Sequence, residues 1–561
     1  MPTSSSPTAS PTSPAVDVRP ARAAAPRARW PLAPAILGWA VGMGLAFRDT
    51  VTSRFALVQG EPVDARLVTY LLEHSYRWLT GAAGHASLWS PPIFYPAPNT
   101  FAYSESLLSV APVYWAFRAL GLPPDTALQW WMLAAATLDY VAMYVLLRRA
   151  VRVGRAPAAL GALLFAFGSV RVAQIRHQHL IPHFYTIVAL LALVRLFEEG
   201  DPGRGPRALR WPALFAAGVV GQLYAAVYYG WFLALALALA GLWALAVPRW
   251  RRALVATLRR RWLVLTVAAM GGLVATAPLA VHYLAAAHAA GYWDYAMVST
   301  MRPRVQSWLY LGPQSWMYHR LAALDVMRAI PMEHEQRLGL GVVTTVCVVA
   351  GFWVQRRRAL VALLALTALT LIVLVTQWPG GRSAWALVYD YVPSARAIRA
   401  VSRVGLVLLI PAAVGLALFA ERLRARPVLG AAVTLLVIVE QGQTLLAYDK
   451  GAVRERAALV AQHVPPGCRA FLFTALHGRE DPWVYHVDAM WASMTLAIPT
   501  VNGYSGRSPP EWPFYAAVVR DSASDAQLTR SLAAWLARWQ LPPSAACRVT
   551  LDIDALTRRS P

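Results

Sequence analysis

Apolar runs of about 20 residues recur along the chain, and this is the length that an α-helix needs to cross a bilayer. The runs that are predicted to be transmembrane helices are residues 31–49, 127–147, 157–173, 181–197, 211–228, 231–247, 262–286, 338–354, 359–377, 404–420 and 428–446. Hydrophobic residues make up 57% of the 561 residues and charged residues only 14%. A soluble domain contains about 25% charged residues, so this chain lacks the polar surface of one. We therefore predict an all-α polytopic membrane bundle with about 11 transmembrane helices.

The positions of the arginines predict the orientation of the bundle. The formal net charge is +24, and Lys450 is the only lysine. Short cytoplasmic connections are enriched in Lys and Arg. With the N-terminus inside, the arginine clusters fall in connections 148–156, 198–210, 248–261, 355–358 and 421–427. The charge is thus interpreted as a topology signal of a multi-pass protein of the cytoplasmic (inner) membrane, and nucleic-acid binding is not expected.

The large polar segments all fall on the predicted outer face. Residues 1–29 are rich in Pro, Ser, Thr and Ala and are predicted to be a disordered cytoplasmic tail. The transmembrane domain, 30–446, carries outer loops 50–126, 288–337 and 378–403. Function in membrane bundles and other rigid scaffolds concentrates in such loops. We therefore expect the chemistry on this side.

One apolar stretch, 107–120, is too short to cross comfortably, and counting it would invert every later arginine cluster. It is predicted to be a helix that lies in the outer interface, where Tyr114 and Trp115 are favoured. A short tilted span is the alternative.

Residues 447–561 are predicted to form a small extracytoplasmic α/β domain. Helix-like runs and short apolar strands alternate there, at 452–463, 469–474, 524–539 and 548–553. Cys468 and Cys547 each stand just before one of the strands. An oxidising compartment favours a disulfide between them, and two free buried thiols are the alternative.

The first outer loop holds the most informative candidates. Asp64 and Glu61 follow the first helix closely, where a carboxylate meets a substrate with its tail in lipid and its head in water. A general base must lie about 2.6–3.2 Å from the proton that it takes, and these acids suit that role. Arg66 and Arg77 are candidate phosphate ligands because guanidinium matches phosphate oxygens. A helix cap, or an ion pair with Arg66, is the alternative for Asp64.

The same loop is rich in aromatic residues, which build amphipathic clefts at a membrane interface. His74, Tyr95 and Tyr103 are therefore candidate substrate-binding residues. The ordinary aromatic belt of membrane proteins is the alternative explanation.

A second group lies at the outer ends of the third and fourth predicted helices. Arg176, His177 and His179 could bind a diphosphate, and the His-x-His pair could ligate a divalent metal. Solvated boundary residues are the more common explanation. No cofactor is certain, and a divalent metal remains an option.

The later loops add acids and arginines. Glu333 and Glu335 precede a predicted helix, so they are expected to cap it, with substrate binding as the alternative. Arg399 and Arg403 are four residues apart and lie with Arg396 on one helical face. This outer arginine stripe favours a phosphate site, with loop salt bridges as the alternative.

Two acids, Asp139 and Glu440, lie within predicted spans, where charges are costly and usually functional. Asp139 has tyrosines beside it and would be hydrogen-bonded within the bundle. Glu440 is near the outer end of its helix and would reach the outer cleft. The segment Gly503-Tyr504-Ser505-Gly506-Arg507 is no nucleophile elbow, because arginine stands where that motif has a second glycine.

Together, an acid soon after the first helix, an interfacial helix in the same loop, many spans and an extracytoplasmic C-terminal part resemble the GT-C integral membrane glycosyltransferases. Three blocks are similar to the bacterial YfhO-like branch: Trp-Ser-Pro-Pro at 89–92, Ile-Arg-Ala-Val-Ser-Arg at 398–403 and Val-Asn-Gly-Tyr-Ser-Gly at 501–506. The resemblance covers residues 31–446 in architecture.

The resemblance implies that a hexosyl or pentosyl group moves, with inversion, from a polyprenyl-phosphate donor to a glycan, lipid or protein acceptor at the outer face, in contact with membrane lipid. It implies that Asp64 is the base, that Glu61 or a later acid is the second carboxylate, and that Arg399 and Arg403 face the lipid phosphate. Many members carry adjacent acids, whereas Pro62 and Val63 separate the two acids here.

Two other functions remain open. A transporter or flippase for lipid-linked glycans would need a polar path near the bilayer midplane and often shows repeat symmetry. A non-catalytic glycan-assembly factor would keep the same scaffold and use the C-terminal domain to hold a partner.

Overall fold

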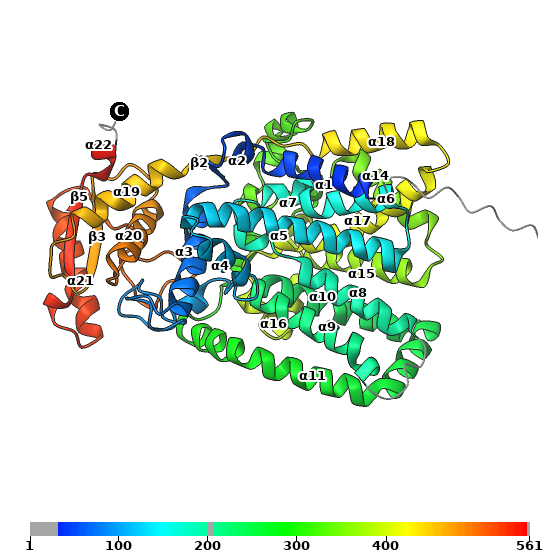
Figure 1. The fold of residues 1–561 in the computed structure, drawn as a ribbon, viewed down its shortest axis with the longest axis horizontal. Coiled ribbons are helices and arrows are strands. Elements are labelled where there is room, and N and C mark those ends of the chain that lie inside the picture. Colours follow the sequence, from blue (N-terminus) through cyan, green and yellow to red (C-terminus); the bar gives the residue numbers. More distant parts are fainter. Residues whose placement is uncertain (1–31, 200–205, 558–561) are drawn as a thin grey trace, which may run out of the picture.

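The computed structural model describes residues 32–199 and 206–557. The predicted tail, 1–29, lies outside the described residues, as do residues 200–205 of the predicted connection 198–210. Figure 1 shows a bundle of long helices at one end of the molecule and the C-terminal α/β part at the other, with α3 (Pro62–Leu79) and α4 (Ala111–Ala119) between them.

Every predicted apolar run coincides with a helix. These helices are α1 (Ala33–Ala46), α5 (Pro124–Leu146), α6 (Arg155–Phe167), α7 (Ser169–Ala173), α8 (Phe184–Glu198), α9 (Pro206–Ala225), α10 (Val227–Ala246), α11 (Pro248–Ala290), α14 (Val342–Val354), α15 (Ala359–Val375), α17 (Val404–Leu423) and α18 (Pro427–Glu440). Among the described residues, six helical stretches are long and apolar enough to cross a membrane, and four apolar helices are shorter. The protein is thus an integral membrane protein, while eleven crossings and their orientation stay predictions.

Helix α17 forms the centre of the bundle. Nearly all its residues from Val404 to Leu418 are buried, and it packs against α6 and α14. A Cβ atom added at Gly351 of α14 would lie 1.9 Å from the carbonyl oxygen of Gly415. Small residues at such contacts let two helix backbones approach closely. The core therefore holds the N-terminal end of α17, which carries Arg403, in a fixed place.

The predicted non-spanning stretch forms α4, which has nine residues. At 1.5 Å per residue it is about 14 Å long, roughly half the thickness of the hydrocarbon core. Tyr114 is buried, and its hydroxyl donates to Glu73 of α3 at 2.9 Å. This helix therefore packs on the first loop rather than crossing.

The C-terminal part has a three-stranded parallel sheet in the order β4-β3-β5, as expected for a small α/β unit. Its elements are α19 (Lys450–Gln462), β3 (Phe471–Leu476), α20 (Pro482–Leu496), β4 (Val518–Val519), α21 (Ser522–Arg538), β5 (Cys547–Leu551) and α22 (Ile553–Thr557). Asp521 and Ser524 form a capping box at the start of α21. A disulfide joins Cys468 to Cys547, which is paired with Phe471 of β3.

The first loop and the C-terminal part share a core. Strand β1 (Leu57–Gln59) pairs antiparallel with β2 (Ala447–Asp449). Leu67 and Leu71 of α3 are buried in one hydrophobic cluster with Met490 and Trp512. The domain boundary at 446/447 stays a prediction, because the packing crosses it. The shared core fixes α3, and hence Asp64, against the C-terminal chain.

Candidate active site at the start of the first outer loop

Asp64 lies in the first turn of α3 and meets two distant segments of the chain. Its Oδ1 accepts a hydrogen bond of 2.5 Å from the hydroxyl of Tyr504, which follows α20. Its Oδ2 lies 2.5 Å from Nδ1 of His177, between α7 and α8. The alternative partner was Arg66, but Arg66 Nη1 donates to Asp488 Oδ1 at 2.6 Å, so that interpretation is wrong. The helix-cap alternative is wrong too, because Glu61 occupies the N-cap position of α3.

His177 is held between two carboxylates. Its Nε2 lies 3.2 Å from Oε1 of Glu335, and the same oxygen accepts a hydrogen bond of 2.9 Å from Arg403 Nη2. The side chains of Glu335 and Arg403 are only 3% and 8% exposed. A continuous chain of polar contacts thus runs from Tyr504 through Asp64 and His177 to Arg403.

The pKa values of this chain follow from burial and from its charges. Burial opposes ionisation of Asp64, but the hydrogen bonds and charge of His177, with the Tyr504 hydroxyl, hold the pKa of Asp64 well below its usual range. The charges of Arg403 and His177 likewise overcome burial and hold the pKa of Glu335 well below its usual range. Burial lowers the pKa of His177, yet Glu335 and Asp64 together raise it. The negative charges of the two carboxylates therefore offset the positive charges of the imidazolium and the guanidinium.

A group of arginines and aromatic rings borders this chain. The guanidinium carbons of Arg399 and Arg507 lie 4.7 and 4.3 Å from the ring centre of Trp293. Arg403 lies 5.0 Å from the ring centre of Tyr228, whose hydroxyl accepts the backbone N–H of Arg399 at 3.0 Å. Within the described part of the chain, no carboxylate forms an ion pair with Arg399 or Arg507. Both cations are therefore available to an anionic ligand.

Electrostatic coupling joins the arginine group to Asp64. Burial and the nearby Asp64 carboxylate raise the pKa of Tyr504, and the charge of Arg399 opposes that rise. Burial and the charge of Arg399 lower the pKa of Arg507. The charges of Asp64 and the two arginines thus influence one another and Tyr504.

Glu105 holds the backbone at Tyr228 in place. Its carboxylate accepts the backbone N–H groups of Val227 and Tyr228, at 2.5 and 3.3 Å, at the start of α10. Burial raises the pKa of Glu105 to about 7. This acid anchors the first turn of α10 and so positions the ring on which Arg403 lies.

The structure brings together Asp64, His177, Arg399 and Arg403 of the predicted site. The ring centre of His179 lies 5.8 Å from that of His177. Glu61 and Arg176 form an ion pair with each other next to this group. These outer-face candidates therefore converge, although Glu61 does not contact Asp64 as a second acid would.

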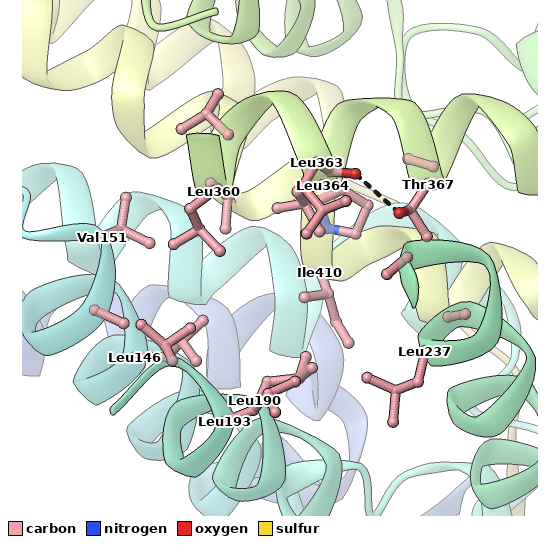
Figure 2. Close-up of a pocket in the computed structure, with 18 of the residues that line it drawn as sticks. Leu146, Val151, Leu190, Leu193, Leu237, Leu360, Leu363, Leu364, Thr367 and Ile410 are labelled. Carbon is pink, nitrogen blue, oxygen red and sulfur yellow. Dashed lines mark hydrogen bonds between the residues drawn. The ribbon is translucent and has the colours of Figure 1, made fainter. Parts of the chain in front are cut away.

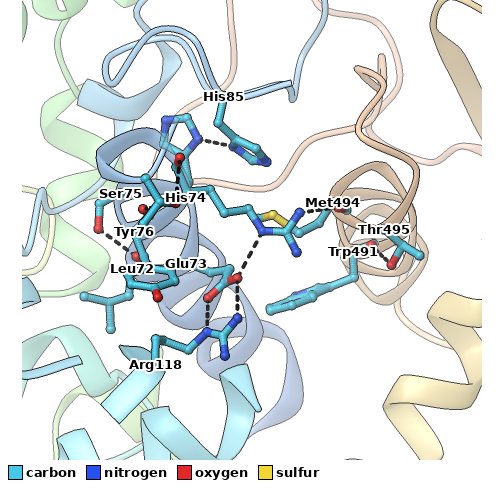
Figure 3. A network of polar contacts seen from close by, with 12 residues as sticks. Leu72, Glu73, His74, Ser75, Tyr76, His85, Arg118, Trp491, Met494 and Thr495 are labelled. Carbon is cyan, nitrogen blue, oxygen red and sulfur yellow. Dashed lines mark hydrogen bonds and ion pairs between the residues drawn. The ribbon is translucent and has the colours of Figure 1, made fainter. Parts of the chain in front are cut away.

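His74 and Arg77 lie about 15 and 20 Å further along α3 than Asp64, at the helical rise of 1.5 Å per residue. Figure 3 shows His74 beside His85 in a buried network of polar contacts, and His74 Nδ1 lies 2.7 Å from His85 Nδ1. Arg77 donates to Glu73 at 3.0 Å and to the carbonyl oxygen of Met494 at 2.6 Å. Burial lowers the pKa of His74 to about 4, so the ring is neutral at neutral pH. The network joins α3 to α20.

The other predicted binding residues lie where the first loop meets the C-terminal part. Arg66 is buried in its ion pair with Asp488. The backbone carbonyl of Tyr95 accepts an indole N–H from α21. Burial raises the pKa of Tyr103, and the charge of Arg507 opposes it, so Tyr103 borders the arginine group.

Glu333 and Glu335 do not cap α14, which corrects the prediction. Glu333 pairs with Arg337 at 2.7 Å. Instead, Glu440 of α18 accepts the backbone N–H groups of Val343 and Thr344, at 2.9 and 2.7 Å. Glu440 is therefore a helix cap supplied by another helix, and the expectation that it reaches the outer cleft was wrong.

Asp139 accepts the backbone N–H of His183 at 2.8 Å. It is hydrogen-bonded within the bundle, as expected from its position among tyrosines.

Tyr504, Arg507, Glu335 and Trp293 were not selected as site residues from the sequence. The glycines around Tyr504 are the signal that could have found it. A Cβ at Gly506 would lie 2.7 Å from the carbonyl oxygen of Tyr103. The segment is thus pressed against the first loop, which a search for known catalytic motifs does not detect.

A metal ion does not fit the residues as they are arranged. In the parts of the chain that the structure describes, no group of three or more His, Cys, Asp or Glu side chains is placed to hold one. Both oxygens of Asp64 already accept hydrogen bonds, and both ring nitrogens of His177 contact carboxylates.

Three solved structures resemble the fold. The apo oligosaccharyltransferase of Archaeoglobus fulgidus aligns with a TM-score of 0.52 and 12% identity, covering 87% of this chain and 65% of that one. The same enzyme in complex with Zn and sulfate gives 0.49 and 12%, covering 86% and 62%. The arabinofuranosyltransferase AftD from Mycobacteria gives 0.45 and 15%, covering 82% and 30%. No protein-family model and no curated protein matches the sequence.

The fold comparison rests on the apo oligosaccharyltransferase, of whose length this chain spans less than two thirds. The protein is therefore similar in fold to that oligosaccharyltransferase.

Proposed function

We propose that this protein is an inverting membrane glycosyltransferase, which moves a hexosyl or pentosyl group from a polyprenyl-phosphate donor to an acceptor hydroxyl at the outer face of the membrane. The observation that carries the proposal is the convergence of Asp64, Tyr504, Arg399 and Arg507 at one place. The fold of an oligosaccharyltransferase supports it. Two of the three blocks similar to the YfhO-like branch, 398–403 and 501–506, contribute residues to this place, and we propose that branch for the chain.

The disulfide between Cys468 and Cys547 supports the predicted orientation, because such bonds persist in oxidising compartments. We therefore propose that the C-terminal part, and with it the candidate site, lies on the outside.

In the proposed reaction the acceptor oxygen attacks the anomeric carbon on the face opposite the phosphate. The new carbon–oxygen bond forms as the bond to the phosphate oxygen breaks, and its electron pair leaves with the polyprenyl phosphate. The acceptor proton passes to Asp64, which requires a hydroxyl about 2.6–3.2 Å away. The Tyr504 hydroxyl already occupies such a position on Oδ1. It marks the place that the acceptor hydroxyl would take.

The low pKa of Asp64 determines at which stage of the reaction the acceptor hydroxyl gives its proton to this carboxylate. A carboxylate held ionised by His177 is a weak base toward a free hydroxyl. It accepts the proton only after bond formation has made the acceptor oxygen acidic. Until then its negative charge stabilises the positive charge that develops on the sugar ring.

The arginines divide into two roles. Arg399 and Arg507 have no carboxylate partner among the described residues and are proposed to bind the leaving phosphate, which guanidinium groups contact in pairs of hydrogen bonds. Arg403 is paired with Glu335 and is proposed as a positioning residue for His177.

A non-catalytic glycan-assembly factor is the second candidate. The observation that favours it is that the chain's own side chains engage both oxygens of Asp64.

The test compares Asp64→Asn with Asp125→Asn, whose carboxylate pairs with Arg454 on the surface. Purified proteins are given labelled polyprenyl-phosphate sugars and acceptor membranes, and the release of polyprenyl phosphate is measured. Loss of a general base lowers such rates by about 10²–10⁴-fold. We expect that loss for Asp64→Asn and wild-type rates for Asp125→Asn. Turnover by Asp64→Asn at the wild-type rate would remove Asp64 from the mechanism.

Donor binding separates the two candidates. Asp64→Asn should retain the labelled donor, whereas Arg399→Ala and Arg507→Ala should weaken its binding. Wild-type protein that binds donors without turnover would favour the assembly factor.

A further inference from the structure

A cavity separate from the candidate active site lies at the end of the bundle away from the C-terminal part. It lies between α5, α8, α10, α15 and α17. It encloses about 370 Å³, within the range of about 300–1,000 Å³ that is usual for ligand sites. Figure 2 shows aliphatic side chains pointing into it from these helices. They include Leu146, Leu190, Leu237, Leu363, Leu364 and Ile410. Its chemistry suits a hydrocarbon chain.

The cavity is elongated along the helix axes. Its lining runs from Glu198 to Thr186 on α8 and from Ala359 to Leu371 on α15. Twelve residues of helix rise about 18 Å. One leaflet of the hydrocarbon core is about 15 Å thick, which is half of its full thickness. The cavity therefore extends through about the depth of a single leaflet.

Two arginines line this cavity at the end of the bundle away from the C-terminal part, where α8 ends and α15 begins. Arg152 Nη2 pairs with Glu198 at 3.0 Å. Arg358 is exposed, and its Nη1 donates only to the carbonyl oxygen of Val151, at 3.4 Å. No carboxylate of the described residues pairs with Arg358. An uncompensated positive charge thus stands directly beside an aliphatic cavity.

We propose that this cavity binds an anionic phospholipid of the leaflet opposite the candidate active site, with an acyl chain inside and the phosphate on Arg358. Charge complementarity supports this occupant. Guanidinium binds phosphate oxygens strongly, and basic pockets between transmembrane helices on the cytoplasmic side hold anionic headgroups. A zwitterionic lipid offers the same chains but no net charge. The site does not depend on the proposed transfer reaction.

The experiment measures lipid selectivity in the full-length protein. Purified protein is equilibrated with equal amounts of phosphatidylglycerol and phosphatidylethanolamine that carry the same chains, and bound lipid is quantified by native mass spectrometry. We expect at least a fivefold preference for phosphatidylglycerol in the wild type and near parity in Arg358→Gln. Arg426→Gln is the matched control, because Arg426 is exposed at the same end but does not line the cavity.

A second variant tests the chain-binding part. Ala368→Trp places an indole inside the cavity and should reduce retention of both lipids at least threefold. Equal binding of the two lipids to the wild type, or equal loss of preference in Arg358→Gln and Arg426→Gln, would overturn the proposal. Wild-type retention by Ala368→Trp would overturn the assignment of the chain to this cavity.

Discussion

The two ends of the bundle use the same residue type in opposite ways. At the end that carries the C-terminal part, the side chains of Arg403 and Arg66 are buried, at 8% and 7% exposure, and each is paired with a carboxylate. At the other end, Arg356, Arg357 and Arg358 are all exposed. The number of arginines per loop therefore does not by itself reveal what each arginine does. Their chemical role is decided by whether the fold supplies carboxylates and aromatic rings around them.

This contrast has an energetic consequence. An exposed ion pair contributes about 0–1 kcal/mol, because water and salt screen it. Removing one partner of a buried pair costs about 3–5 kcal/mol, because the remaining charge is left buried without compensation.

The largest expected effect is a loss of stability when Arg403, a buried and paired arginine, is replaced. Arg403→Met leaves Glu335 buried without its guanidinium partner, so we expect a loss of about 3–5 kcal/mol in unfolding free energy, measured by equilibrium unfolding in detergent. Arg424→Met is the matched change at the other end, where Arg424 is 62% exposed in its pair with Glu421, and should cost less than about 1 kcal/mol. Equal losses in both variants would show that burial does not distinguish the two ends.

The next effect tests the difference in compartment. The disulfide joins cysteines 79 residues apart, and replacing both by Ser should cost about 2–4 kcal/mol of stability. Alkylation of unreduced, denatured protein should modify Cys347 alone, since it is the free cysteine of the chain. Modification of three thiols would contradict both the bond and the assignment of this end to an oxidising compartment.

A smaller effect concerns Tyr504. Tyr504→Phe removes the hydroxyl that donates to Asp64, and such a bond contributes about 0.5–1.5 kcal/mol. Because this bond lowers the pKa of Asp64, its loss should move the acid limb of the rate–pH profile upward by about one unit. Turnover should stay within about tenfold of the wild type. An unchanged acid limb would show that the hydroxyl does not control Asp64.

The smallest effect is a pH dependence of stability at His177. Its pKa is raised by Glu335 and Asp64, so its stabilising contribution is complete below the ordinary histidine pKa of about 6.5 and is lost as pH rises through the raised value. The stability difference between wild type and His177→Gln should therefore shrink from pH 6 to pH 9. The exposed His463→Gln should show no such trend. A difference that grows with pH would contradict a protonated His177.

The helices could be predicted because their signal is local. Runs of apolar residues located the bundle helices, and the helix-like run at 524–539 located α21. Helix α20 was missed because its buried face includes polar side chains, His486 and Asp488.

The site could be predicted only in part. Asp64 contacts residues 113 and 440 positions away, and contacts over such distances leave no pattern in the local sequence. The local alternative for Asp64 was an ion pair with its neighbour Arg66, whose partner in the structure is 422 residues away. The arginine stripe was found because its spacing is helical, while the lone Arg507 offered no such spacing.

The pairing of β1 with β2, and of Asp64 with Tyr504, has a consequence for biosynthesis. Translation passes all the bundle helices before it reaches Tyr504 and Arg507, so a nascent polypeptide inserted up to α18 still has an incomplete centre. Under the proposed function, the donor lipid would not be cleaved until the segment with Tyr504 and Arg507 has crossed the membrane and packed against the first loop. Chains that terminate early would therefore be inactive and would not hydrolyse the donor.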